Sequence, residues 1–349
     1  MSEVKVLSAA EIKDFVVNVL TTVKVSAQQA QDVAEAMAFA HLRGFDTHGI
    51  PCLPGYVECL QENRINPRPD LKFEQLSPWS GTLDADNSLG AVAATRAMNE
   101  ALRMAGEIGI GAVTVRRSNH FGAAGAYARL ALPHDCIAIV AANSAAVTAP
   151  FGAAEPYLGT NPLAIAVPAG EQADYLLDMA TSEGSRKKIR KALAEGLQIP
   201  PGWAIDSAGN PTTDPAKALE GVMLPFGGPK GSAITLLADL LAGVLSGGSF
   251  GKTVRSVYSN QEQECGTGHF FLVMKVASFM PVAEFKQRMD EQFSAIRSLK
   301  PAAGFAEVSY PGERETRLEK ERSVQGIPIN QPVLGDMRKL AGHLKISFP

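Results

Sequence analysis

The chain has 349 residues, of which 46% are hydrophobic and 20% charged, and its formal net charge is −3. This composition predicts a soluble globular chain with one large or two to three smaller domains, and excludes a disordered one. The slightly acidic balance gives no basic signature for nucleic acid or an anionic membrane, and no apolar run reaches the ~18 residues of a bilayer span.

The chain carries no obvious targeting or metal-binding signal. Its first residues, Met1-Ser2-Glu3-Val4-Lys5, lack the apolar core of a signal peptide. The four cysteines, at positions 52, 59, 136 and 265, form no C-x-x-C pair and no metal-ligand cluster. We therefore expect a cytoplasmic protein with reduced thiols and no metal.

The N-terminal part predicts a small helical unit. Ser8-Ala9-Ala10-Glu11 is a capping box, followed by apolar residues at helical spacing. A second helix begins after Ser26 and ends near Gly44, and a third short helix spans 53–60. The Asn66-Pro67-Arg68-Pro69 stretch is a linker signal.

The middle of the chain alternates apolar runs with turn residues. One or two short strands are expected in 71–84, followed by an Ala-rich helix over 90–108. Further strands are predicted at 110–115, 136–142, 163–167 and 175–179. Because the last three follow one another without helices between them, they predict a mixed or antiparallel sheet rather than a βαβ series.

The second half of the chain is mostly helical in pattern. Helices are predicted at 183–196, 230–246, 282–299, 313–322 and 331–344, with a hairpin-like loop at 200–214 and a buried strand at 270–276. The helix at 183–196 is strongly basic, which is most simply a solvated face.

The most informative stretch is Arg116-Arg117-Ser118-Asn119-His120-Phe121-Gly122-Ala123-Ala124-Gly125. It lies between a predicted strand and an Ala-rich helix over 123–132. Such a turn places a side chain in a cleft and aims backbone N–H groups at an anion. His120 can exchange a proton near neutral pH there; the alternative is a histidine that only satisfies backbone carbonyls.

A second glycine-rich stretch, Leu224-Pro225-Phe226-Gly227-Gly228-Pro229-Lys230-Gly231-Ser232, precedes the apolar helix. It predicts an anion site with Lys230 on a phosphate, or an ordinary glycine-rich helix start. It is not a P-loop, because the lysine precedes Gly231. The chain also lacks G-x-G-x-x-G, so a dinucleotide would bind to a different construction from the Rossmann fold.

Two further residues have chemical potential. His48, in Asp46-Thr47-His48-Gly49, lies at a helix-to-helix joint with two possible hydrogen-bond partners, and is either functional or structural. Asp178 ends a predicted strand, where a carboxylate can accept from ribose hydroxyls or cap the next helix. The other four histidines, including His41 and His269, are interpreted as structural or surface residues.

Together these stretches resemble the type 2 malate/L-lactate dehydrogenase family, which also contains sulfolactate and ureidoglycolate dehydrogenases, diketogulonate reductase and the piperideine-2-carboxylate reductases. The pieces keep the family's order over most of the chain: Thr47-His48-Gly49-Ile50, Ser118-Asn119-His120-Phe121-Gly122, Asn143-Ser144, Gly159-Thr160-Asn161-Pro162-Leu163, Asp178-Met179-Ala180-Thr181-Ser182, Leu224 to Gly231, and Tyr310-Pro311-Gly312-Glu313. The regions 249–251 and 302–311 look most like ureidoglycolate dehydrogenase.

The resemblance implies an α/β fold without a Rossmann unit. Its nucleotide domain is a largely antiparallel or mixed sheet flanked by helices, its N- and C-terminal segments form a helical domain, and its members are homodimers. We expect a helical domain from 1–75 with 310–349, a substrate-side region from 76–122 with 270–309, and an NAD(P)-binding domain at 123–269.

The resemblance also implies roles for individual residues. His120 matches the acid/base near the reacting carbon, and His48 a second active-site histidine that is the proton donor in the imine reductases, with Thr47 beside it. Substrate contacts are implied at Tyr56, Thr160 and position 52. Cofactor contacts are implied at His120, Phe121, Gly122, Ser144, Asp178, Met179, Ala180, Lys230, Gly312 and Glu313.

Two departures from the family pattern concern the substrate. The family usually has a carboxylate-binding arginine where this chain has Cys52, so a cation such as Arg43, Arg117 or one of the 186–191 run would have to compensate, or the substrate lacks that carboxylate. Position 188 is a lysine, as in the hydroxyacid dehydrogenases, where the imine reductases have aspartate. Lys187 replaces the family's usual glycine.

The sequence therefore predicts an oxidoreductase that transfers a hydride between NAD or NADP and a small 2-hydroxy or 2-oxo acid. Reduction of a cyclic imine acid is the related alternative, and a dinucleotide-binding protein without turnover is the alternative of a different class. The choice between NAD and NADP stays open, because no fingerprint locates the side chains near the ribose 2′-position.

Overall fold

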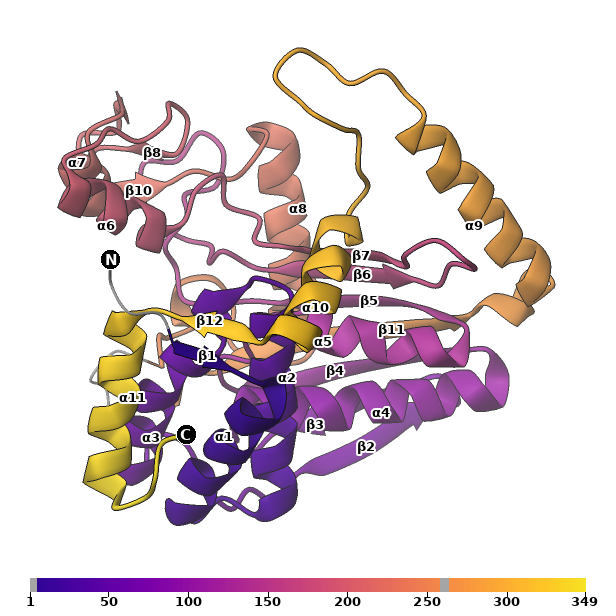
Figure 1. The fold of residues 1–349 in the computed structure, drawn as a ribbon, viewed down its shortest axis with the longest axis horizontal. Coiled ribbons are helices and arrows are strands. Elements are labelled where there is room, and N and C mark those ends of the chain that lie inside the picture. Colours follow the sequence, from indigo (N-terminus) through magenta and orange to yellow (C-terminus); the bar gives the residue numbers. More distant parts are fainter. Residues whose placement is uncertain (1–4, 258–263) are drawn as a thin grey trace.

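A computed structural model describes residues 5–257 and 264–349 (Figure 1). Positions 1–4, on which the expectation about a signal peptide partly rests, lie outside these residues. None of the helices in the described ranges combines the length and apolar character that a bilayer-spanning helix needs.

A seven-stranded sheet forms the centre of the molecule, in the order β2-β3-β4-β11-β5-β6-β7. Its strands are β2 (Lys72–Ser77), β3 (Ser80–Asp84), β4 (Ile110–Ser118), β5 (Cys136–Ala142), β6 (Leu163–Val167), β7 (Tyr175–Met179) and β11 (Thr267–Lys275). All neighbours are antiparallel except β3 and β4, which α4 (Gly90–Ile108) connects in parallel. The predicted mixed, non-Rossmann sheet is confirmed, because turn-only connections between β5, β6 and β7 leave no room for crossover helices.

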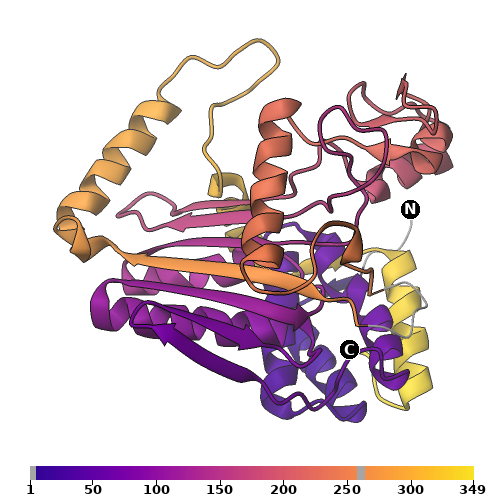
Figure 2. The ribbon, with the colours of Figure 1, turned by 180° about the vertical axis from the view of Figure 1, so that it is seen from behind.

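Helices cover both faces of this sheet (Figures 1 and 2). On one face α4 packs along β3, β4 and β11, and α5 (Gly125–Ala128) packs over β5 to β7. On the other face lie α8 (Pro229–Asp239) and a π-helical turn, η4 (Leu240–Val244), which contacts β4, β5 and β11. Because both faces are covered, the inner strands are nearly continuous apolar runs.

The two chain ends pack together as expected. Helices α1 (Ala9–Thr22), α2 (Ala27–Leu42) and α3 (Leu53–Gln61) contact α10 (Glu313–Gln325) or α11 (Gln331–Leu344). Strands β1 (Lys5–Leu7) and β12 (Ile327–Ile329), which the sequence did not predict, pair antiparallel across this junction. The capping box at Ser8 is present, with the Glu11 N–H donating to Ser8 Oγ at 3.1 Å.

The remaining elements project from the sheet (Figure 1). One lobe contains α6 (Arg186–Glu195), α7 (Pro215–Glu220), β8 (Ala204–Ile205), β9 (Pro211–Thr212) and β10 (Val222–Met223). A long helix, α9 (Val282–Arg297), extends from the opposite end. The proposed domain boundaries stay a prediction, since one sheet runs through 72–275.

Two helices differ from their predicted extent. The helix expected over 123–132 is only the four residues of α5, continued by a 3₁₀ segment, η3 (Arg129–His134), that contains Pro133. The helix expected over 230–246 loses its α geometry at Leu240, where the Leu245 N–H donates to the Leu240 carbonyl. The two segments still cover opposite faces of the sheet.

Candidate active site

The turn between β4 and α5 carries His120, and contacts with the start of α4 and the residues before it hold this turn in place. The buried Asn119 amide donates to Asn87 Oδ1 at 2.9 Å and to the Ser88 carbonyl at 2.8 Å. Gly90 lets this turn lie against the start of α4, because a Cβ atom there would stand 2.5 Å from the His120 carbonyl oxygen. The His120 ring is therefore held by a rigid backbone.

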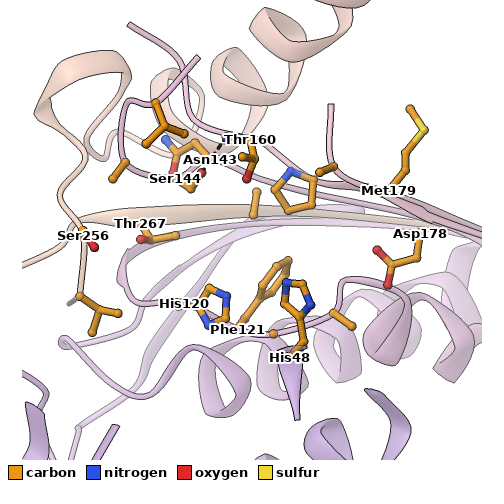
Figure 3. Close-up of a pocket in the computed structure, with 18 of the residues that line it drawn as sticks. His48, His120, Phe121, Asn143, Ser144, Thr160, Asp178, Met179, Ser256 and Thr267 are labelled. Carbon is orange, nitrogen blue, oxygen red and sulfur yellow. Dashed lines mark hydrogen bonds between the residues drawn. The ribbon is translucent and has the colours of Figure 1, made fainter. Parts of the chain in front are cut away.

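The N-terminal helical unit brings two partners to His120, of which Figure 3 shows His48. The Tyr56 hydroxyl lies 2.6 Å from His120 Nδ1 and 3.3 Å from the His120 carbonyl oxygen. The His48 ring stacks on the His120 ring with centroids 5.8 Å apart and planes at 17°. Thr47 Oγ1 lies 3.2 Å from His48 Nδ1. Four predicted site residues thus form one cluster.

Both histidines are held neutral. Desolvation, followed by the positive charge of Lys187, lowers the pKa of His48 to about 4. Desolvation, then His48 and Lys187, lowers the pKa of His120 to about 3. At neutral pH each ring therefore carries one N–H group and one nitrogen lone pair, which is the form in which an imidazole acts as a base.

A third histidine supports this pair from behind. His269 is fully buried, stacks on Phe121 with centroids 4.5 Å apart, and lies 2.8 Å from Ser118 Oγ through Nε2. Burial lowers its pKa to about 3. The Tyr127 hydroxyl donates to the Phe121 carbonyl, which closes the layer beneath the site.

The histidine pair faces a cavity of about 410 Å³. Its lining includes nine predicted site residues: His48, His120, Phe121, Gly122, Ser144, Thr160, Asp178, Met179 and Ala180. Asn143, Ser144 and Thr160 lie across the cavity from the histidines (Figure 3). That wall is braced internally, because the Thr160 N–H donates to Ser144 Oγ at 3.1 Å.

Asp178 has one of the two roles that the sequence left open, the helix cap, although on a different helix. Its Oδ2 accepts from the Gly125 N–H at 2.8 Å, so it caps α5 rather than the helix that follows it in the chain. It also lines the cavity. Burial raises its pKa to about 6, against the lowering by the backbone hydrogen bonds.

Three predicted cofactor residues lie outside the cavity lining. Lys230 is exposed in the first turn of α8, beside a second cavity that Gly227 and Gly228 line. The Gly312 carbonyl accepts from the Arg43 guanidinium at 3.1 Å, and Glu313 pairs with Arg297 at 3.3 Å. Their assignment to the cofactor stays a prediction.

Other lining residues were not predicted. Arg255, Ser256 and Val257 reach the cavity from the segment before β11, and Thr267 reaches it from the first position of that strand. None belongs to a motif. The pairing of β11 between β4 and β5, together with the hydrogen bond from Arg64 to the Val257 carbonyl at 2.8 Å, brings this segment to the site.

Position 52 lies next to the histidine pair without a charge of its own. Cys52 is buried and its thiol donates to the Thr47 carbonyl at 3.3 Å. The same carbonyl accepts from Lys187 Nζ at 3.1 Å. A cation therefore does reach this neighbourhood, from α6.

The cavity has the size of a small-molecule binding site. Its volume falls in the ~300–1,000 Å³ range of small-molecule sites. Gly122 lines the cavity with backbone alone, and its φ of +81° favours glycine. A Cβ atom built on it would lie 3.6 Å from the His48 carbonyl oxygen. Over residues 5–257 and 264–349, no group of three or more His, Cys, Asp or Glu side chains is arranged to hold a metal ion.

The non-Rossmann sheet and the neutral histidine pair that faces the cavity agree with an oxidoreductase acting on CH–OH groups. The chain belongs to the malate/L-lactate dehydrogenase family, whose model matches residues 7–338.

Individual relatives agree with this assignment. The L-sulfolactate dehydrogenase of Methanocaldococcus jannaschii is 39% identical over 343 residues, 98% of each chain, and its structure superposes with a TM-score of 0.93 over 99% of this chain and 98% of that one. The ureidoglycolate dehydrogenase (NAD(+)) of Escherichia coli K12 is 32% identical over 93% of this chain and 92% of its own length. The Δ1-piperideine-2-carboxylate reductase of Pseudomonas syringae is 27% identical, with a TM-score of 0.84 over 97% of this chain and all of the other.

Proposed function

We propose that this chain transfers a hydride reversibly between NAD(P) and a small anionic 2-hydroxy or 2-oxo acid of the sulfolactate, malate or ureidoglycolate type. The observation that carries the proposal is the pair of neutral, stacked histidines facing the cavity. The names of the relatives support the substrate class. Bound NAD(P) would supply the hydride donor or acceptor.

His120 is the residue that exchanges the hydroxyl proton of the substrate. Its ring lines the cavity and its Nδ1 lies 2.6 Å from the Tyr56 hydroxyl, so we assign the proton exchange to Nε2. The Tyr56 hydroxyl lies within reach of both Nδ1 and the His120 carbonyl. It can therefore accept from Nδ1–H, while donating to that carbonyl, both when the neutral ring takes up the substrate proton at Nε2 and when the imidazolium returns it. This serves reduction and oxidation equally.

The other predicted residues position the reactants. His48, with Thr47, is the neighbour or alternate donor, and Thr160 is a substrate contact on the opposite wall. Phe121, Gly122, Ser144, Asp178, Met179 and Ala180 line the cavity portion assigned to the cofactor, with Lys230, Gly312 and Glu313 as outer contacts. Pre-set geometry of this kind lowers the barrier by holding the reacting carbons together.

Reduction of a cyclic imine acid is the second candidate, favoured by the fold shared with the piperideine-2-carboxylate reductase. The side chain at position 188 argues against it. This position has aspartate in the imine reductases, whereas here it has Lys188. The Lys188 ammonium lies over the Trp203 ring, 5.9 Å from its centroid.

The test follows the loss of reduced-nicotinamide absorbance. NADH and NADPH are each offered with pyruvate, oxaloacetate, sulfopyruvate, oxalurate, diketogulonate and piperideine-2-carboxylate. We expect turnover of a 2-oxo acid, abolished by His120→Ala while dinucleotide affinity is retained. Full activity in His120→Ala would overturn the assignment, and turnover of the imine alone would favour the second candidate.

We also propose a homodimer in the cytoplasm. The family resemblance implies the dimer, and an exposed apolar face on α8 and η4 supports it: Leu236, Leu237, Leu240, Val244 and Leu245. Light scattering should give about twice the 36.9 kDa of one chain, and Leu237→Asp should shift it to the monomer. A wild-type monomer would contradict the dimer, and cell fractionation tests the location.

A further inference from the structure

Helix α6 aims one cation at the histidine pair. Ser185 caps this helix, with its Oγ accepting from the Lys188 N–H at 3.2 Å, and the fully buried Ile189 anchors it to its lobe. From the first turn, Lys187 Nζ reaches the Thr47 carbonyl at 3.1 Å, although the residue as a whole is exposed. Its charge acts on both His48 and His120.

The other cations named as candidates are engaged elsewhere. Arg43 donates to Glu319 at 2.7 Å and to the Gly312 carbonyl. Arg117 pairs with Asp84 and Glu264, each at 2.9 Å.

Within α6, the neighbours of Lys187 also turn away from the site. Arg186 donates to the Leu219 carbonyl at 3.2 Å, and Lys188 lies over Trp203. Lys191 faces Glu195 at 3.7 Å. Lys187 is thus the cation of α6 whose hydrogen bond is seen to reach the N-terminal unit.

The contact leaves Lys187 with capacity for a ligand. An ammonium has three N–H donors, and the Thr47 carbonyl takes one of them. The buried Cys52 thiol donates to the same carbonyl oxygen, so the thiol and the ammonium both bind the residue that precedes His48. The residue after that carbonyl is His48, which lines the cavity.

We propose that Lys187 binds the carboxylate of the 2-oxo or 2-hydroxy acid, entering the site from α6 in place of a cation on the N-terminal helices. The proposal rests on the proposed function and makes Lys187 a substrate-binding residue of that same site. It also places the carboxylate contact on a different structural unit from His48 and Tyr56, so the substrate bridges the two units.

Arg255 is the rival cation, because it lines the cavity on the segment before β11. Because it lies on a segment separate from α6, single substitutions can distinguish its contribution from that of Lys187. The experiment therefore treats Lys187 and Arg255 side by side.

The test compares a 2-oxo acid turned over by the wild type with the corresponding 2-oxo amide, which has the same carbonyl but no anionic group. Lys187→Met should raise the KM for the acid by about 10- to 100-fold, the range of a lost charge-assisted hydrogen bond, with a much smaller change in kcat and little change for the amide. Lys187→Arg should recover most of the affinity for the acid. Lys191→Met, one turn further along α6, is the matched control and should behave as the wild type.

A measurement without turnover tests the placement of the charge. His48 faces Thr47 and Lys187, and His120 faces Tyr56, His48 and the Phe121–His269 layer. Histidine NMR titration of the protein without substrate should show higher pKa values for His48 and His120 in Lys187→Met. Unshifted histidines would remove the electrostatic basis of the proposal.

The outcomes separate the two levels of inference. An acid KM unchanged in Lys187→Met, or raised only in Arg255→Met, overturns the role of Lys187 while the proposed function stands. Turnover of no 2-oxo acid by the wild type overturns the proposed function itself. Cys52→Arg combined with Lys187→Gly should restore acid affinity lost in Lys187→Gly alone; failure of that rescue would show that the anion lies elsewhere.

Discussion

The buried histidines should make the fold sensitive to mild acid, and His269 allows this to be measured at one residue. His269 is 0% exposed and its pKa is lowered to about 3, so it stays neutral in the folded chain at pH 5. In the unfolded chain a histidine titrates near pH 6.5 and is protonated at pH 5. The unfolded chain therefore binds more protons in this window, and the free energy of unfolding falls as the pH falls below 6.5.

The expected size follows from the unfolded-state pKa. Each pH unit below 6.5 costs ~1.36 kcal/mol for a histidine kept neutral in the fold, so going from pH 7 to pH 5 costs about 2 kcal/mol for His269. Asp178 acts in the opposite direction, because its pKa is raised to about 6. That contribution is common to the wild type and a His269 variant, and cancels in their difference.

The assay is urea unfolding at pH 7 and pH 5, followed by far-ultraviolet circular dichroism, for the wild type and His269→Gln. Glutamine retains a polar group for Ser118 but does not titrate. The loss of unfolding free energy between the two pH values should be smaller by about 2 kcal/mol in the variant. An equal loss in both proteins would refute the view that His269 is buried in its neutral form.

Three further predictions concern the site. Tyr56→Phe removes the hydroxyl 2.6 Å from His120 Nδ1 and should lower kcat by about 10- to 100-fold with an unchanged dinucleotide Kd; an unchanged kcat would contradict the bridging role. Gly90→Ala puts a Cβ 2.5 Å from the His120 carbonyl oxygen, so steady-state kinetics should show kcat loss in a folded protein, and full activity would mean that the turn can shift freely. Asp178→Ala deprives the Gly125 N–H of its acceptor and should lower the free energy of unfolding by ~1–3 kcal/mol in thermal unfolding. It should also weaken dinucleotide binding in titration calorimetry, and wild-type values in both assays would exclude Asp178 from the site.

The strands that the sequence predicted correctly are those whose signals are local. The strands at 136–142, 163–167 and 175–179 have the predicted bounds because each is a short apolar run closed by turn residues. Strand β4 extends past the predicted end at Val115 to Ser118. Its last residues are polar and gain their strand conformation from pairing with β3 and β11, which periodicity does not encode.

Long-range pairing also explains what the sequence left out. The three-residue strands β1 and β12 pair across 320 positions, and neither is long enough to produce a pattern of its own. The position of β11 between β4 and β5 brings Arg255 to the cavity. His120 and Asp178 could be predicted because they belong to local motifs. Arg255 could not, because it reaches the cavity only through the three-dimensional arrangement of the chain.

The low pKa values of His48 and His120 have a consequence for the order of events at the site. A neutral imidazole can accept a hydroxyl proton, but reduction of a ketone needs the imidazolium form of His120, which donates its Nε2 proton and becomes neutral. The ring must then take up a proton again before the next reduction. The ammonium of Lys187 opposes that protonation while the site holds no anion. A bound carboxylate on Lys187 would offset the positive charge and raise the pKa of both rings. Substrate binding and proton supply are then coupled through one side chain, and the anion contact contributes to proton transfer as well as to affinity.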